Sequence, residues 1–455
     1  MSAGSPIELA ERALGFLRGE GQATVTRERS LLLRFARSAP TQATDIHDTS
    51  IHLLALRNGH TGGATTNVAT DEALRDAARR AMAAAEAAAG AAGGPGDHPG
   101  LPAPPDGYRG HHGYDLRTAR MDPAPGGEAL QAAFTVAAEH GLEAFGAWTS
   151  GAVETAIAST AGVHAVDRVT DAYVKTILRD AHGRTGWDAQ AAVGVADLDP
   201  AAGARRAAAK VTGEEPVTLP PGEYPVVLDV EAVGSLLEQL GSLAFDGQAY
   251  AEGRGALEGR LGTRVAAAAI NLSDSPRYGQ TLPRAFDFEG VPKAPIPLIQ
   301  DGVAHRVVHD SRSAALAGGG ARSTGHAVVP GGDQHGPTPT NLVLVGGGAD
   351  GIDELLAPIA RGIYVTRLWY LNVVHPQQTL VTGTTRDGTF LIEDGQITRP
   401  LRDVRFTDSV LRILEATEAL TAASRLTSEA EFYGRRFAFG TVAPALRAQG
   451  FRVTG

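Results

Sequence analysis

The chain of 455 residues carries 41 Lys and Arg against 51 Asp and Glu, a formal net charge of −10, and has no Cys. The negative charge argues against a protein that binds nucleic acid by neutralising phosphates. The lack of Cys excludes disulfides, thiolate zinc sites, iron–sulfur clusters and a Cys nucleophile. Hydrophobic residues make up 43 % of the chain, enough for a sizeable core, and no apolar run of about 18 residues suggests a membrane span. We therefore expect a soluble, cytoplasmic protein with neither a nucleic-acid nor a membrane partner.

Residues 1–90 predict a small unit of helix, antiparallel hairpin and helix. Ser5-Pro6-Ile7-Glu8 has the pattern of a capping box with Pro in the first helical turn. Apolar residues alternate over 31–35, and a second apolar run at 51–56 leads into Asn58-Gly59, a strong hairpin turn. An Ala-rich helix follows, which Asp71 is placed to cap.

Two further units follow a linker. Residues 91–110 are rich in Pro and Gly and cannot hold a helix or a central strand. Residues 111–215 predict a central unit with a helix at about 127–140 and strands at 144–148, 153–159 and 171–178. Residues 220–455 predict a large β-rich unit with a strand at 226–228 and helices at 231–240, 353–360 and 408–420. The expected fold class is α+β, in which this C-terminal unit has a mixed or antiparallel sheet.

One glycine-rich segment could bind a phosphate. Gly346-Gly347-Gly348 lies between an apolar run beginning at Asn341 and a helix predicted from Ile352. Such a loop can hold a phosphate at a helix N-terminus. The spacing is not Gly-x-Gly-x-x-Gly, and no acidic ribose partner follows about 20 residues later. We therefore predict an ordinary strand-to-helix turn.

His305 and His309 form His-x-x-x-His, a spacing that brings two zinc ligands together on a helix. Here they follow Asp301-Gly302, which predicts the turn of a hairpin. Two strand residues four apart lie roughly 13 Å from each other, too far for one metal ion. We therefore interpret them as partly exposed strand residues.

The most informative segment is Val230-Glu231-Ala232-Val233-Gly234-Ser235, which opens the helix predicted after the strand at 226–228. From the residues alone, Glu231 is a favourable charge near a helix N-terminus. The segment resembles the TldD/PmbA (TldD/TldE) metallopeptidase family. Its active TldD-type subunit has a His-Glu-x-x-x-His motif here, in which both His bind the metal and Glu is the expected general base. This chain has Val230 and Ser235 at the ligand positions and lacks the family's third ligand, a Cys near the C-terminus. The resemblance therefore implies a vestigial motif, with no catalytic residue and no metal in this chain.

The resemblance continues, in order, through the C-terminal half. Its further matches are the family's Asp-x-Glu-Gly turn at 287–290, its Leu-Ile-x-x-Gly hairpin at 298–302, Thr-Gly-His at 324–326 where Thr-Gly-Asn is usual, Thr-Asn at 340–341, and the segment 390–395. From these segments the resemblance suggests five substrate-binding residues: Asp287, Glu289, Gly325, His326 and Asn341.

What the resemblance implies about function is a metal-free TldE/PmbA-type subunit that pairs with a TldD-type subunit carrying the His-Glu-x-x-x-His motif and zinc. Such a heterodimer would hydrolyse peptide or amide bonds in unfolded peptides, leader peptides or a biosynthetic intermediate. A second hypothesis is a stand-alone hydrolase with a different nucleophile or a relocated metal, which could use some of His305, His309, His326, His335 and His375. A third is a peptide-binding protein without a peptidase partner.

Overall fold

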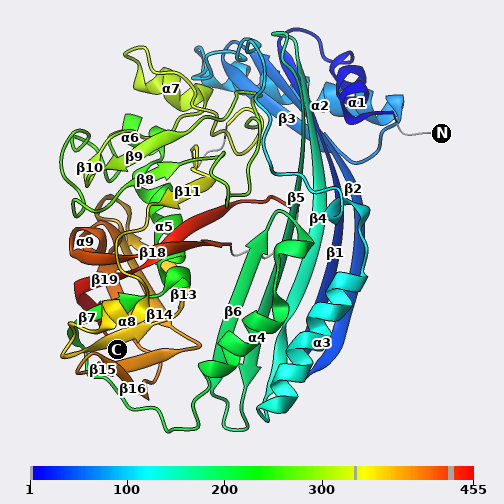
Figure 1. Ribbon diagram of the computed structural model, residues 1–455. Helices are drawn as coiled ribbons and strands as arrows, with labels where there is room; N and C mark the ends of the chain where they lie inside the picture. The colour runs from blue at the N-terminus through cyan, green and yellow to red at the C-terminus, as the bar shows by residue number, and fades with distance from the viewer. Residues whose placement is uncertain (1–3, 333–335, 429–434) are drawn as a thin grey trace.

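The computed structural model describes residues 4–332, 336–428 and 435–455, which form two β-sheets with helices packed on them (Figure 1). The first sheet has the strand order β3-β2-β1-β4-β5-β6. Four of its strands, β1, β2, β4 and β5, are 16 to 19 residues long. The elements of this N-terminal half are α1 (Pro6–Leu14), β1 (Gly21–Ala36), β2 (Ala39–Arg57), β3 (His60–Thr66), α2 (Asp71–Ala92), η1 (Thr118–Arg120), α3 (Ala124–Glu139), β4 (Glu143–Ser159), β5 (His164–Arg179), β6 (Thr185–Ala192), η2 (Val195–Asp197) and α4 (Pro200–Ala209).

Local signals at the start of the chain are confirmed. Ser5 and Glu8 form the predicted capping box of α1. Asn58 and Gly59 turn β2 into β3 with φ values of 49° and 76°, the left-handed conformation that this hairpin turn requires. One detail differs: Thr70, and not Asp71, is the N-cap of α2, since its hydroxyl accepts the backbone N–H of Ala73.

The first sheet joins segments from both sides of the predicted linker. β1 pairs with β2 on one edge and with β4 on the other. The unit expected at 1–90 and the unit expected at 111–215 therefore share one sheet, and the segment at 91–110 connects two parts of it. The strands predicted at 144–148 and 153–159 are a single strand, β4.

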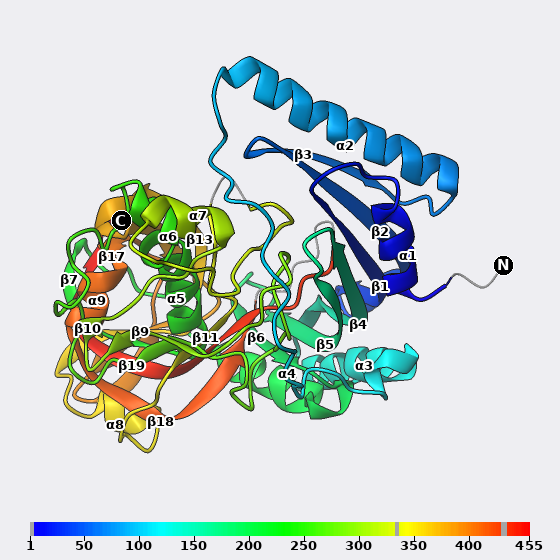
Figure 2. The ribbon, with the colours of Figure 1, turned by 90° about the horizontal axis from the view of Figure 1, so that it is seen from above.

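The two faces of this sheet differ in polarity. Apolar side chains such as Val25 and Phe35 of β1 pack under α1 and α2 at one end and under α3 and α4 at the other. The alternate side chains of β1 are buried although they are polar: Gln22, Thr24, Thr26, Glu28 and Ser30. They face the C-terminal half, where the backbone N–H of Arg436 donates to Glu28 and Gln22 donates to the carbonyl of Phe288. Figure 2 shows the two halves side by side from above.

The C-terminal half contains a branched, 13-stranded sheet in the part of the chain that the structure describes, with the main order β10-β9-β8-β11-β19-β7-β12-β15-β16. Parallel and antiparallel pairs both occur, so the predicted α+β class with a β-rich C-terminal unit is confirmed. Its elements are β7 (Gly222–Leu228), α5 (Val230–Ala244), α6 (Gly247–Ala251), β8 (Leu272–Asp274), β9 (Ile296–Gln300), β10 (Val303–Ala304), α7 (Ser311–Ala317), β11 (Asn341–Leu344), α8 (Ile352–Leu356), β12 (Arg361–Val365), β13 (Leu368–His375), η3 (Pro376–Gln378), β14 (Leu380–Thr385), β15 (Thr389–Glu393), β16 (Gln396–Pro400), β17 (Arg405–Ser409), α9 (Val410–Glu415), β18 (Thr417–Thr427) and β19 (Gly440–Val453).

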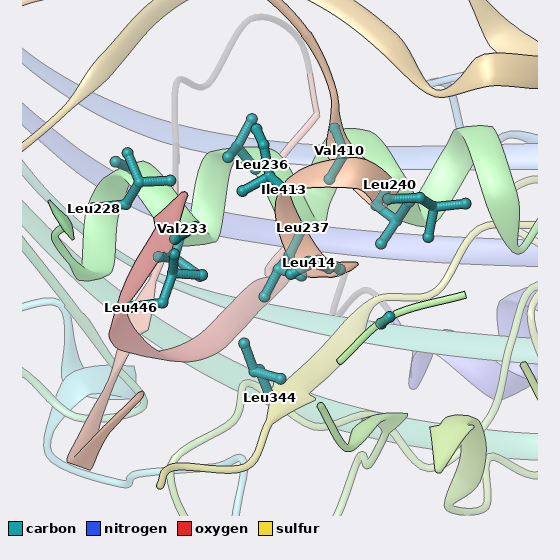
Figure 3. Close-up of a cluster of buried hydrophobic side chains, with 14 of the residues drawn as sticks. Leu228, Val233, Leu236, Leu237, Leu240, Leu344, Val410, Ile413, Leu414 and Leu446 are labelled. Carbon is teal, nitrogen blue, oxygen red and sulfur yellow. The ribbon is translucent and has the colours of Figure 1, made fainter. Parts of the chain in front are cut away.

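Helix α5 lies at the centre of this half. Its Leu236, Leu237 and Leu240 are buried against α9 and the neighbouring strands (Figure 3). At the amino end of the helix, a Cβ on Gly234 would lie 2.1 Å from the Thr427 hydroxyl of β18, so only Gly lets this strand approach so closely. The sequence motif thus stands at the junction of a buried helix and an edge of the sheet.

Two helices predicted in this half are shorter in the structure. The helix expected at 408–420 ends at Glu415, and β18 begins at Thr417 because this segment pairs with β19. The helix expected at 353–360 is α8, which ends at Leu356. None of the described helices is both long and apolar enough to cross a membrane.

Candidate functional site

The candidate site lies where β7 leads into α5. Asp229 caps this helix: its Oδ1 accepts the backbone N–H of Val230 at 2.8 Å. Its other oxygen, Oδ2, accepts the hydroxyl of Tyr364 from β12 at 2.7 Å. Because both carboxylate oxygens have donors, Asp229 is held in one orientation at the rim of the site.

The two motif positions that the family resemblance marks as metal ligands have side chains unsuited to zinc. The Val230 side chain has no donor atom and packs against an apolar cluster. The Ser235 hydroxyl donates to the carbonyl of Glu231 at 3.0 Å, within the helix. The sequence has no Cys, and the described residues contain no group of three or more His, Asp or Glu placed to hold a metal ion. The residues present do not fit a zinc ion at this motif.

Glu231 is buried, in contrast to the helix-start charge that the sequence suggests. Its Oε1 lies 3.1 Å from the guanidinium of Arg425 on β18. Burial raises the pKa of Glu231 to about 7, although Arg425 acts in the opposite direction. The carboxyl group therefore has a protein cation as its partner, and it changes charge near neutral pH.

Beside this pair lies a cavity of about 630 Å³. It lies between the end of α4, the start of α5 and one edge of β18. The lining residues are Asp188, Arg206, Ala209, Lys210, Thr212, Asp229, Val230, Tyr364, Thr366, Phe390, Ile397, Ala423, Ser424 and Arg425. Its size falls in the range of small-ligand sites, roughly 300–1,000 Å³.

Charged groups of both signs surround this cavity. Arg206 donates to both oxygens of Asp188, at 2.9 and 2.8 Å. Lys210 donates to the carbonyl of Trp187 at 2.7 Å. Burial lowers the pKa of Lys210, and the nearby carboxylates of Asp229 and Asp188 partly offset this effect. We term Lys210, Arg425, Asp188, Asp229 and Glu231 the charged cluster.

The predicted substrate-binding residues lie elsewhere, and none of them lines this cavity. Asp287 stabilises a turn: its oxygens accept the backbone N–H groups of Glu289, Val291 and Ala327, each at 2.9 Å. Glu289 accepts both the backbone N–H and the hydroxyl of Ser311. Burial raises the pKa of both carboxyl groups.

Of the other three predicted residues, Asn341 and His326 belong to a neighbouring polar network around Asp274, and Gly325 precedes His326 in the chain. The backbone N–H of Asn341 donates to Asp274 at 2.9 Å, and the Asn341 side chain donates to the carbonyl of Leu282. His326, which is 1 % exposed, lies 3.3 Å from Asp274. Gly325 has φ of +79°, and a Cβ there would lie 2.8 Å from the carbonyl oxygen of Pro292.

Lys293 completes this network. Its ammonium lies 3.5 Å from Asp274 and donates to the hydroxyl of Thr340. Burial opposes the ionisation of Asp274, yet Lys293 and His326 hold the pKa of Asp274 well below its usual range. We term the residues at 274, 287, 289, 293, 326, 340 and 341 the buried network.

The buried network adjoins a second, much smaller cavity. It measures about 20 Å³ and is lined by Asp287, Gly325, His326 and Lys293 among others. That volume has room for about one water molecule. The substrate-binding role of the five residues stays a prediction, while their contacts show that they support the fold.

The glycine loop at 346–348 has a structural explanation. The backbone N–H of Gly347 donates to the carbonyl of Thr421, and that of Ala349 donates to the carbonyl of Leu420. A Cβ on Gly347 would lie 2.7 Å from the carbonyl oxygen of Leu420. The loop therefore covers one part of the edge of β18, and Gly lets the two backbones approach.

The histidines of the second hypothesis are dispersed. The predicted hairpin turn at Asp301-Gly302 joins β9 to β10, but β10 ends at Ala304, so His305 and His309 follow the strand instead of lying in it. His309 is buried, with Nδ1 3.2 Å from the Ser313 hydroxyl. His375 ends β13, and His335 lies outside the described residues.

Sequence reasoning missed most of the charged cluster. Lys210, Arg425 and Asp188 belong to no motif and come from three distant segments. One signal was available: the chain has only three Lys, at positions 175, 210 and 293. Lys210 and Lys293 each lie in one of the two polar clusters, which a count of rare residues could have indicated.

Comparisons with known proteins agree with this architecture. The model of the PmbA/TldA metallopeptidase C-terminal domain matches residues 221–455, and the model of PmbA/TldA metallopeptidase domain 1 matches residues 23–85. The first match alone covers more than half of the chain. This chain belongs to the PmbA/TldA metallopeptidase family.

Individual relatives are distant. A metalloprotease of Methanothermobacter thermautotrophicus is 27 % identical over 47 % of this chain and 48 % of its own length. A metalloprotease TldD homolog of Haemophilus influenzae is 26 % identical over 46 % of this chain and 43 % of its own length. The chain thus spans about half the length of the curated relatives it matches. The crystal structure of TldE from Thermococcus kodakarensis superposes with a TM-score of 0.85 at 20 % identity, covering 98 % of this chain and 99 % of that one, and shows the same fold.

Proposed function

We propose that this chain is the non-catalytic, metal-free subunit of a TldD/TldE-type heterodimeric zinc metallopeptidase. The observation that carries the proposal is the contact between Glu231 and Arg425, beside Val230 at a position where an active subunit has a metal ligand. The partner would be a TldD-type subunit with the His-Glu-x-x-x-His motif, and it would supply the zinc. The substrate would be an unfolded peptide, a leader peptide or a biosynthetic intermediate with an amide bond.

The chemistry at the motif supports this assignment. In a metallopeptidase the glutamate acts on a water molecule that the metal has made acidic. Here the Glu231 carboxyl faces the guanidinium of Arg425, which is always charged. Unlike a metal ion, a guanidinium cannot coordinate a water molecule and make it acidic. Glu231 therefore has an ion-pairing role, and hydrolysis requires a site on another chain.

A surface suited to a partner lies on β13. In the described residues this strand pairs only with β14, so its other edge is open. Tyr370, Val373 and Val374 are 75 %, 43 % and 52 % exposed. Exposed apolar groups beside an open strand edge are typical of a surface that another chain covers. Segment 363–368, by contrast, is largely buried and would support the contact from inside.

The alternative of a stand-alone hydrolase has less support. His326 is fully enclosed next to Asp274, so a substrate cannot reach it. His309 is buried against Ser313. A peptide-binding protein without a peptidase partner remains the competing proposal, and the experiment below separates the two.

The test is reconstitution with a TldD-type protein from the same genome. We expect a heterodimer by light scattering, zinc only in the partner, and peptide or amide hydrolysis only by the mixture. Replacement of the partner's motif Glu by Gln should abolish hydrolysis. One equivalent of zinc that stays on this chain alone through dialysis against a mild chelator, or separate species at micromolar concentration, would overturn the proposal.

A further inference from the structure

Around the 630 Å³ cavity, the acidic side chains have hydrogen-bond donors from the protein, whereas the basic side chains have N–H groups without an acceptor among the described residues. Both oxygens of Asp188 accept from Arg206, and both oxygens of Asp229 accept from Val230 and Tyr364. Glu231 accepts from Arg425. The acceptors therefore already have donors from the protein.

The basic groups have donors to spare. The Lys210 ammonium, which has three N–H bonds, donates to one protein acceptor in the described part of the chain, the carbonyl of Trp187. The Arg425 Nε is buried and has no hydrogen-bond partner there, although its terminal nitrogens face Glu231 and Asp188. Lys210 has N–H bonds to spare and Arg425 lines the same cavity with its positive charge, so an acceptor entering the cavity would gain from both groups.

Part of the remaining wall is apolar. Val230, Phe390, Ile397 and Ala423 line the same cavity. Ile397 is 42 % exposed, which places it at an open side. A ligand that matches this wall carries a hydrophobic group next to its acceptor.

We propose that this cavity binds a carboxylate that carries an apolar side chain, with Lys210 and Arg425 as its hydrogen-bond donors. Two sources share this chemistry: the C-terminal residue of a peptide and a free apolar acid. If the peptide is the source, this subunit holds the C-terminal end of a chain while the partner acts elsewhere on it. The role in holding a peptide for the partner rests on the proposed function, whereas binding of the carboxylate by the isolated chain does not.

The first experiment needs no variant. Isothermal titration calorimetry of the purified chain at pH 7 would compare N-acetyl-leucine with N-acetyl-leucinamide, and the tripeptide Ala-Ala-Leu with its C-terminal amide. We expect the two acids to bind and each amide to bind at least about tenfold more weakly, because the amide lacks the negative charge. Tighter binding of the tripeptide acid than of N-acetyl-leucine identifies a peptide C-terminus, and equal binding identifies the free acid as sufficient.

Variants then locate the site. Lys210→Met keeps the apolar stem and removes the charge, so it should weaken binding of the acids by about tenfold or more. Lys210→Arg keeps the charge and should recover part of the binding that Lys210→Met loses. Lys175→Met on β5, outside the lining of this cavity, is the matched control and should bind like the wild type. Melting temperatures verify that each variant is folded.

Equal binding of acids and amides, absence of binding by all four compounds, or unchanged binding by folded Lys210→Met would each overturn the proposal. These results leave the reconstitution experiment untouched, because calorimetry on the isolated chain involves neither partner nor zinc. A reconstituted pair without activity would conversely leave the calorimetric result standing.

Discussion

The buried network around Asp274 and the charged cluster around Lys210 contain similar side chains in different surroundings. In the buried network, Lys293 and Asp274 are 3 % and 0 % exposed, and the adjacent cavity has room for about one water molecule. In the charged cluster, equivalent groups line an open cavity of about 630 Å³. The closed cluster makes its contacts within the chain, out of reach of a ligand, and supports the fold, whereas the open cluster places its donors beside a cavity that a ligand can enter.

The residues that identify the family in the sequence are therefore different from the residues that line the open cavity. Asp287, Glu289, Gly325 and Asn341 belong to the motifs that make the family visible in the sequence. Their contacts are with the chain itself, and most are with backbone N–H and C=O groups. A turn that needs one particular residue type leaves a stronger sequence signal than a cavity that needs only a charge.

The largest expected effect on stability comes from removing the central carboxylate of the buried network. Asp274→Ala would leave Lys293 and His326 without their carboxylate and remove the acceptor for two backbone N–H groups. We expect the free energy of unfolding, measured by urea denaturation, to fall by about 3–5 kcal/mol. Asp76→Ala, which breaks an exposed ion pair on α2, is the control and should leave the urea midpoint nearly unchanged. Similar losses in both variants would remove the distinction between buried and exposed charges.

The next effect concerns the pH dependence of the open cluster. Burial raises the pKa of Glu231 from its ordinary value of 4.5 to about 7 in the folded chain, where the carboxyl group faces Arg425, Asp188, Lys210 and Asp229. The folded state therefore binds a proton that the unfolded state has lost, and the contribution of Glu231 to stability falls as pH rises from about 4.5 to 7. Glu231→Gln keeps a neutral side chain throughout.

We expect the stability of Glu231→Gln relative to wild type to increase by on the order of 2–3 kcal/mol between pH 5 and pH 8. Urea denaturation at several pH values measures this difference. Parallel curves for the two proteins would show that Glu231 keeps an ordinary acidity in the folded state.

A smaller effect should come from the glycine loop that supports the cavity wall. Gly347→Ala would place a methyl group 2.7 Å from the Leu420 carbonyl oxygen of β18. We expect a loss of about 1–3 kcal/mol in the free energy of unfolding. Gly348→Ala, where a Cβ would have no neighbour within 4 Å, is the matched control. A neutral Gly347→Ala would mean that the loop is not pressed against the strand.

The smallest effect is expected in catalysis. In the reconstituted heterodimer, Glu231→Gln should leave the hydrolysis rate within about threefold of wild type, a change of less than ~1 kcal/mol in the barrier. Val230 and Ser235 leave this carboxyl no metal-bound water to activate. Steady-state kinetics measures the rate, and a cooperative melting transition of the variant verifies the fold. A hundredfold loss would show that Glu231 takes part in the reaction.

Local signals in the sequence were sufficient for many elements. The capping box at Ser5, the Asn58-Gly59 turn and the Asp301-Gly302 turn depend on neighbouring residues, and each forms as predicted. The end of α9 was not predictable in this way. The segment after Glu415 has helix-forming residues, but pairing with β19 makes it a strand. Tertiary contacts here outweigh local propensity.

The candidate site was predictable only in part. The motif at Val230, Glu231 and Ser235 marked the correct end of α5. The burial of Glu231 was not predictable, because its partner Arg425 is 194 residues away in the sequence. Lys210 reaches the same cavity from the end of α4, in the other half of the molecule. Pairings over such distances leave no local pattern for a single sequence to show.

The position of β19 has a consequence for how the molecule is made. This strand, the last in chain order, lies in the middle of the C-terminal sheet and pairs with β7, β11, β17 and β18. During synthesis on the ribosome, β7 emerges more than two hundred residues before the strand that must lie beside it. Until then the nascent sheet has two open edges facing a gap, each able to pair with the wrong strand. A ribosome that pauses before residue 440 therefore exposes an aggregation-prone intermediate, and we expect chaperone capture to be strongest at that stage.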